Sequence, residues 1–182
     1  MTDGLVRILC FGDSNTWGYS PKDGARYSVH VRWTGVLQSL LGNDYQLIEE
    51  GLNGRTTDLD YSNRYGRNGR SYLIPCLDSH APLDYVILNL GANDTKIEFA
   101  RSPENICAAI QEGAGIYGDR LMGATRKVAT LATLYHALAM QYGLLFVDLS
   151  HIAPSPIDGV HLSEEAHQTI ARTMYETIRR QK

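Results

Sequence analysis

Short apolar runs alternate with helical patterns along this chain of 182 residues, and that alternation restricts the possible folds more than any other feature. Strands separated by helices are typical of a parallel sheet with helices packed on its faces. The sequence therefore predicts an α/β fold, and its length is that of one domain, spanning residues 1–182. Strands are expected at 5–11, 45–49, 83–90 and 144–149.

The expected helices are marked by residues that favour helix ends. Ser102 and Pro103 are suited to the N-cap and the first helical position of one helix. Ser163 precedes a second helix that carries acidic residues in its first turn and arginines at its end, in agreement with the helix dipole. Helices are expected at 32–41, 103–112, 120–142 and 164–180, and residues 52–75 are expected to form a long surface excursion.

Composition excludes several classes of partner. The formal net charge is −3 and no run of Lys or Arg is present, so a nucleic-acid partner is not expected. No apolar stretch approaches the ~20 residues of a membrane span, and the N-terminus lacks a signal-peptide pattern, so we expect a cytoplasmic protein without a membrane partner. The three cysteines have no CxxC spacing and the histidines no HExxH spacing, so neither a metal nor another cofactor is expected.

Small and polar residues follow the end of each expected strand. In a parallel sheet the carboxyl ends of the strands share one edge, where ligands bind. Ser14 follows the first strand, and Asp158 and His161 follow the last. A serine hydroxyl becomes a good nucleophile when a histidine takes its proton and a carboxylate orients that histidine. These three residues therefore predict a catalytic triad.

Acyl transfer also needs hydrogen-bond donors directed at the developing oxyanion. The backbone N–H groups of Ser14 and Gly54 and the side-chain amide of Asn93 come from three strand ends, and their convergence would form an oxyanion hole. Asp13 and Asn53 are candidates for substrate contact, although an Asp in a turn often bonds backbone instead.

Aromatic residues follow Ser14 closely. Trp17 is a candidate for substrate binding, and Trp17, Tyr19 and Tyr27 could form an acyl or alcohol pocket. Aromatic residues are also enriched at subunit contacts, so the sequence leaves both roles open.

The segments FGDSNTWG, GLNGRTT, GANDT and DGVHL, in that order, resemble the four sequence blocks of the GDSL esterases in the SGNH-hydrolase superfamily. The resemblance implies a three-layer α/β/α flavodoxin-like sheet. It also implies that Ser14 is the nucleophile, His161 the base and Asp158 its partner, with Gly54 and Asn93 in the oxyanion hole.

Within the family, the stretches RWTGVL, EEGLNGRTT and GANDTK look closest to bacterial arylesterases and acyltransferases. The resemblance thus implies a serine esterase acting on small acetyl or aryl esters, able to transfer the acyl group to alcohols or peroxide, and a homo-oligomer. Two alternatives stay open, namely a carbohydrate acetylesterase of the same superfamily and a catalytically silent flavodoxin-like binding protein. The acidic Asp13 beside the first turn argues against a phosphate ligand.

One departure from the family concerns the sheet. The resemblance implies a further strand between the third and the last, and no apolar run supplies it between Glu112 and Gly113. Closing that gap would move the loop of Asp158 and His161 by about one strand spacing of ~4.8 Å, which would break a Ser–His hydrogen bond. Either the chain is a shortened variant with a rebuilt site, or a segment is omitted from the sequence. We favour omission, because both flanks look normal.

Overall fold

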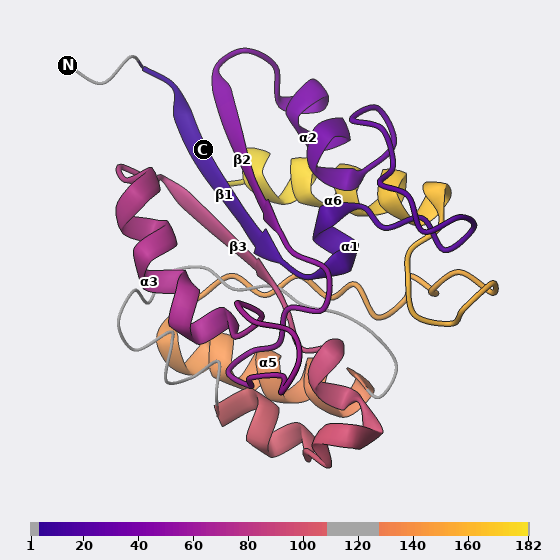
Figure 1. Cartoon of the computed structure of the whole chain (residues 1–182). Coiled ribbons are helices and arrows are strands. Elements are labelled where there is room, and N and C mark those ends of the chain that lie inside the picture. Colours follow the sequence, from indigo (N-terminus) through magenta and orange to yellow (C-terminus); the bar gives the residue numbers. More distant parts are fainter. Residues whose placement is uncertain (1–3, 109–127, 182) are drawn as a thin grey trace.

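The computed structural model describes residues 4–108 and 128–181, which form a small parallel sheet with helices on both faces (Figure 1). Within these residues the strand order is β2-β1-β3. The strands are β1 Val6–Gly12, β2 Tyr45–Gly51 and β3 Tyr85–Asn89. The α/β class predicted from the sequence is confirmed.

Two helices cover one face of the sheet and a third covers the other. Figure 1 shows α2 and α6 together on one side of the strands and α3 on the opposite side. The helices are α1 Ser14–Trp17, α2 Trp33–Leu41, α3 Gly69–His80, α5 Val128–Tyr142 and α6 Glu164–Arg179, with 3₁₀ turns η1 Asn93–Thr95 and η2 Ile97–Phe99. Residues 103–108 are also helical.

The central strand β1 is buried on both faces because successive side chains of a strand point to opposite sides. Ile8 and Cys10 join the core beneath α2 and α6. Leu9 and Phe11 join the core beneath α3. All four side chains are fully buried, so β1 fixes the position of whatever follows its carboxyl end.

The strand expected at 144–149 is wrong. Within the described residues this segment pairs with no strand. Val147 and Leu149 stay packed in the core with α6, and an apolar hollow lined by Ile87, Leu145 and other residues separates the segment from β3. Strands pair only at ~4.8 Å, so the segment has no partner at the required distance.

The segment that the family would supply between Glu112 and Gly113 lies outside the described residues, as does the part of the expected helix 120–142 before residue 128 and the end of the helix expected at 103–112. Among the described residues, no strand pairs with β3 on the side away from β1.

Helix α3 was not predicted, since residues 52–75 were expected to form a surface excursion. Gly69 and Pro75 lie within this helix and are poor helix formers. The helix is stabilised instead by the Asn68 N-cap, whose side chain accepts a hydrogen bond from the backbone of Ser71, and by packing of Cys76 and Leu77 on the sheet. In the described part of the chain, no helix is long and apolar enough to cross a membrane.

Candidate active site

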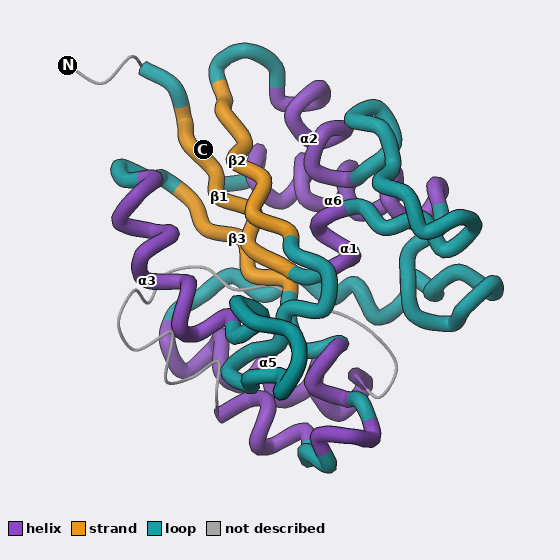
Figure 2. The backbone as a smooth tube through the Cα atoms, in the orientation of Figure 1, coloured by secondary structure: helices purple, strands orange, loops and turns teal. Residues whose placement is uncertain are grey.

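The three strands end level with one another. Gly12 of β1 is in register with Gly51 of β2 and with Asn89 of β3. Loops gather at this edge of the sheet, as Figure 2 shows. The polar blocks that follow these strands in the sequence therefore begin at the same edge of the sheet.

The turn from β1 into α1 presents Ser14. A β-carbon at Gly12 would lie 2.8 Å from the carbonyl oxygen of Asn89, so only glycine lets the strand end here. Asp13 is the N-cap of α1, and its carboxylate accepts a hydrogen bond of 2.9 Å from the Asn15 N–H. Ser14 is 6% exposed at the start of this short helix.

His161 lies between Ser14 and Asp158. Its Nε2 is 3.0 Å from Ser14 Oγ, and its Nδ1 is 2.7 Å from Asp158 Oδ2. The other carboxylate oxygen of Asp158 accepts hydrogen bonds of 3.0 Å from the backbone N–H groups of Val160 and His161. Partial burial opposes ionisation of Asp158, but these hydrogen bonds outweigh it and hold its pKa below the ordinary range.

The Ser–His hydrogen bond, which a shift of the Asp158 and His161 loop by one strand spacing was expected to break, is intact. In the segment before this loop, Val147 and Leu149 pack in the core with residues of α6. The bond is present at 3.0 Å. Leu162 follows the loop and its N–H donates to the Asn15 side chain at 3.2 Å, which ties the last block directly to the first.

Two of the backbone donors predicted for the oxyanion hole are free. Within the described residues, neither the N–H of Ser14 nor that of Gly54 has a hydrogen-bond acceptor. Gly54 has a φ of +81°, a conformation that favours glycine. Asn93 is 9% exposed, and its Nδ2 donates 3.0 Å to the carbonyl of Arg55, which leaves its second amide hydrogen for another acceptor.

The structure also assigns supporting positions to Arg55, which the sequence analysis missed, and to Asp94, whose place beside Asn93 predicts a structural role in bonding loop backbone. Arg55 is buried, and its guanidinium donates to the carbonyls of Gly12 and Glu50. Asp94 is fully buried and accepts hydrogen bonds from the N–H and hydroxyl of Thr57. Arg55 lies in the block GLNGRTT next to Gly54, and Asp94 lies in the block GANDT next to Asn93. A charged residue next to a predicted oxyanion donor is the sequence feature that marks both positions.

The three candidates for substrate contact lie in different surroundings. Asp13 is buried, and that burial raises its pKa to about 7. Trp17 is half-buried, and its carbonyl accepts a hydrogen bond from the side chain of Arg26. The side-chain oxygen of Asn53 is buried and has no hydrogen-bond partner within the described residues. Elsewhere in the described part of the chain, Glu50, Cys76 and His80 form a cluster of possible metal ligands, and none of the three belongs to the triad.

A serine, a histidine and an aspartate bonded in series at the carboxyl edge of a parallel sheet define a serine hydrolase. The chain belongs to the GDSL-like lipase/acylhydrolase family, whose model matches residues 10–169. It is a carboxylic ester hydrolase with the SGNH fold, as the resemblance of the four blocks implied.

Solved structures agree with this assignment. The chain is 36% identical to the aryl esterase of M. smegmatis in its inhibitor-bound form, with 96% of this chain and 99% of that chain covered and a TM-score of 0.85. It is 31% identical to a carbohydrate acetylesterase family member from Sinorhizobium meliloti, with 96% and 98% covered and a TM-score of 0.91. Among curated proteins, no sequence matches the chain.

Proposed function

We propose that the chain hydrolyses small acyl esters through an acyl-enzyme on Ser14. His161 takes the proton from the Ser14 hydroxyl, whose oxygen attacks the ester carbonyl. The tetrahedral intermediate collapses as His161 returns the proton to the leaving alcohol. Water then attacks the acyl-enzyme, giving its proton to His161, and the second tetrahedral intermediate collapses as His161 returns that proton to Ser14 Oγ and the carboxylic acid is released.

The observation that carries this proposal is the position of His161 between a hydroxyl at 3.0 Å and a carboxylate at 2.7 Å. A hydrogen bond from Nδ1–H to Asp158 leaves Nε2 unprotonated and facing the serine, which is the tautomer that a general base needs. The negative charge of Asp158 also stabilises the imidazolium that forms during attack.

The oxyanion would be held by the N–H groups of Ser14 and Gly54 and by the amide of Asn93. Free donors in a largely buried site support this role, because they need no reorganisation when charge develops on the substrate oxygen. Each such donor contributes about 3 kcal/mol to transition-state stabilisation in enzymes where one has been removed.

The first test compares hydrolysis of p-nitrophenyl acetate by the wild type and by Ser14→Ala. We expect Ser14→Ala to lose nearly all activity and to lose labelling by a fluorophosphonate probe. Ser39→Ala is the matched control, because Ser39 is an exposed serine on α2. Equal turnover in Ser14→Ala and Ser39→Ala would refute the proposed nucleophile.

Intact mass should be recorded on the same samples. A mass of 20.2 kDa in an active sample would show that the esterase works without an additional segment of sequence. An excess of roughly 2–3 kDa, the mass of about 20–25 residues, would support omission of a segment that could supply one strand and its connections.

A second candidate substrate class is acetylated carbohydrate. It is favoured by the similarity to the Sinorhizobium meliloti carbohydrate acetylesterase structures, at TM-scores of 0.90 and 0.91. The two candidates are distinguished by comparing kcat/KM for phenyl acetate and for an acetylated sugar. A preference of tenfold or more, equivalent to about 1.4 kcal/mol in transition-state binding, would decide between them.

We also propose that the acyl group can be transferred from Ser14 to an alcohol instead of to water. Ser14 is 6% exposed, and limited access of water to an acyl-enzyme on it would favour an alcohol acceptor. The test measures the ratio of ester exchange to hydrolysis as ethanol is added to a vinyl ester. A ratio no greater than the molar ratio of ethanol to water would argue for a simple hydrolase.

A further inference from the structure

Two consecutive glutamates of β2 point to opposite faces of the sheet. Glu49 pairs with Arg32 and Arg26 on the side of α2. Glu50 points to the other side, where its Oε1 lies 3.0 Å from His80 Nε2. Because side chains alternate along a strand, Glu50 shares its face with Ile48, which packs in the core beneath α3.

Helix α3 presents Cys76 and His80 on one face. Residues four apart in a helix are neighbours on its surface, so both side chains reach down to the same part of β2. Cys76 is 1% exposed, whereas the side chains of His80 and Glu50 are 29% and 20% exposed. The thiol is therefore enclosed, and the other two groups remain accessible from solvent.

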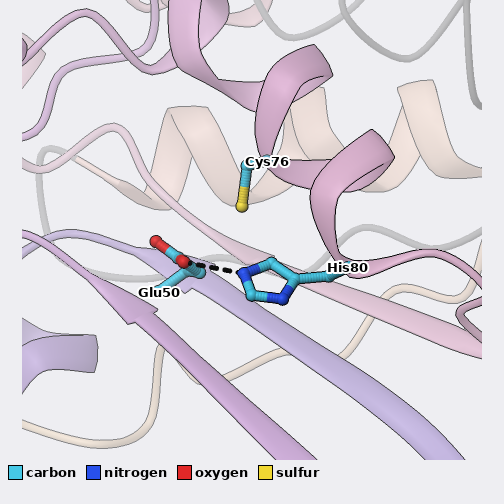
Figure 3. Close-up of side chains that lie close together, drawn as sticks. All are labelled: Glu50, Cys76 and His80. Atoms are coloured by element: carbon cyan, nitrogen blue, oxygen red, sulfur yellow. Dashed lines mark hydrogen bonds and ion pairs between the residues drawn. The ribbon is translucent and has the colours of Figure 1, made fainter.

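These three side chains converge from two elements, as Figure 3 shows. One ligand atom from each of Glu50, Cys76 and His80 lies within 4.8 Å of the others. Ligands of a tetrahedral zinc ion, bound at ~2.0–2.3 Å, are separated by about 3.3–3.6 Å. Small side-chain rotations would bring the three atoms to that spacing.

We propose that Glu50, Cys76 and His80 bind a divalent transition-metal ion of the zinc class. A thiolate, an imidazole and a carboxylate are the ligand types that zinc takes in proteins, and the thiolate disfavours Mg²⁺ and Ca²⁺. Three protein ligands leave a fourth position for water, which the exposed side of His80 and Glu50 can admit. This proposal departs from the sequence-based expectation of no metal, because the ligands come from β2 and from the helix that was not predicted.

The charge around the cluster is compatible with a dication. Glu50 carries one negative charge, and the thiol proton of Cys76 is released when the sulfur binds metal. The guanidinium of Arg55 is the nearby cation, and it is occupied by the carbonyls of Gly12 and of Glu50 itself. Metal binding would thus fix Glu50, whose carbonyl holds the arginine behind the nucleophile turn. The site is structural in this proposal and takes no part in ester hydrolysis.

The test titrates the metal-free full chain with Zn²⁺ and separately with Co²⁺. We expect one equivalent of Zn²⁺ to bind at micromolar or lower concentration and to raise the melting temperature. Co²⁺ should give a thiolate-to-metal charge-transfer absorption. Cys76→Ser should abolish that absorption, and His80→Gln should weaken Zn²⁺ binding about tenfold or more.

Matched controls remove the same residue types elsewhere. Cys107→Ser replaces a partly exposed thiol outside the cluster, and His136→Gln replaces an exposed histidine of α5. Both should bind metal as the wild type does, and ester hydrolysis without metal reports whether each variant is folded. Absence of micromolar Zn²⁺ binding by the wild type would overturn the proposal. So would a charge-transfer band that survives in folded Cys76→Ser or disappears in folded Cys107→Ser.

Discussion

The ring of Tyr19 lies against the imidazole of His161, with the ring centroids 4.1 Å apart and the planes tilted by 31°. His161 is thus held on three sides, by the hydroxyl of Ser14, the carboxylate of Asp158 and the face of an aromatic ring. The sequence analysis left Tyr19 open between a substrate pocket and a subunit contact. In the structure it is a positioning residue for the proposed base.

Tyr19→Ala is expected to lower kcat more than it raises KM. Loss of the ring lets the imidazole turn away from Ser14, and a displacement near 1 Å can cost up to about 100-fold in rate. We expect a loss of about tenfold, measured with p-nitrophenyl acetate. Tyr19→Phe keeps the ring and should retain near wild-type kcat. A larger loss in Tyr19→Phe than in Tyr19→Ala would show that the hydroxyl matters and the stacking does not.

Asp158→Asn is expected to lower kcat by about 10⁴-fold with little change in KM. The amide can still accept the backbone N–H groups of Val160 and His161, so the loop should keep its shape. The new amide would present its N–H to Nδ1 of His161. This favours the imidazole tautomer whose Nε2 carries the hydrogen and cannot accept the serine proton. Steady-state kinetics, with circular dichroism as the folding check, measure this. Retention of more than a tenth of kcat would contradict the assigned role.

Ser14, Gly54 and Asn93 could be predicted from the sequence because each lies a few residues after the end of a strand. Ser14 and Asn93 come directly after runs whose apolar patterns are unambiguous, and parallel strands bring such ends to one edge. Family resemblance then assigned their roles. The predicted bounds of β1, β2 and α6 agree with the structure to within a few residues.

The parts that could not be predicted depend on contacts between distant segments. Helix α3 contains Gly69 and Pro75, and tertiary packing of Cys76 and Leu77 outweighs their poor propensity. Residues 144–149 have a strand-like apolar pattern, but pairing needs a neighbour at the right distance and none is available within the described residues. Burial of Arg55 likewise arises from contacts with β1, β2 and α3 and cannot be inferred from local sequence.

Asp13 gives a prediction about pH. Burial raises the pKa of its carboxyl from an ordinary value of about 3.9 to about 7. Between these values the folded chain holds a proton that the unfolded chain has lost, so stability falls as pH rises, by about 1.4 kcal/mol per pH unit from this group. Above pH 7 the contribution is constant, because both states are then ionised.

Asp13→Asn removes that dependence and keeps an oxygen that can accept the Asn15 N–H. We therefore expect the stability of Asp13→Asn relative to the wild type to increase from pH 5 to pH 7 and then to level off. Urea unfolding at fixed pH values measures the difference, in which the other titrating groups cancel. Parallel stability profiles for the two proteins would mean that Asp13 is ionised throughout this range.

Arg55 should matter for both stability and rate although it touches no substrate in the proposed mechanism. Its guanidinium is almost fully buried, lies 4.0 Å from the ring centroid of Phe11, and donates 3.0 Å to the carbonyl of Gly12, directly before the nucleophile turn. Its own carbonyl accepts the amide of Asn93. One residue thus fixes two strand ends of the site relative to each other.

Arg55→Met keeps much of the side-chain volume but removes the guanidinium donor from the carbonyls of Gly12 and Glu50, of which Gly12 keeps the backbone N–H of Leu52 as a second donor. Loss of the hydrogen bond to a buried carbonyl costs about 1–3 kcal/mol, so we expect the free energy of unfolding to fall by roughly 1–3 kcal/mol. Because Arg55 then no longer holds Gly12 and Asn93 in position relative to each other, kcat should also fall in the fraction that remains folded. Arg172→Met is the control, since Arg172 is exposed on α6. Urea unfolding and kcat are measured for both variants at a temperature where both are folded. We expect Arg55→Met to have the lower stability and the lower kcat. Equal values in the two variants would show that the buried guanidinium does not support the site.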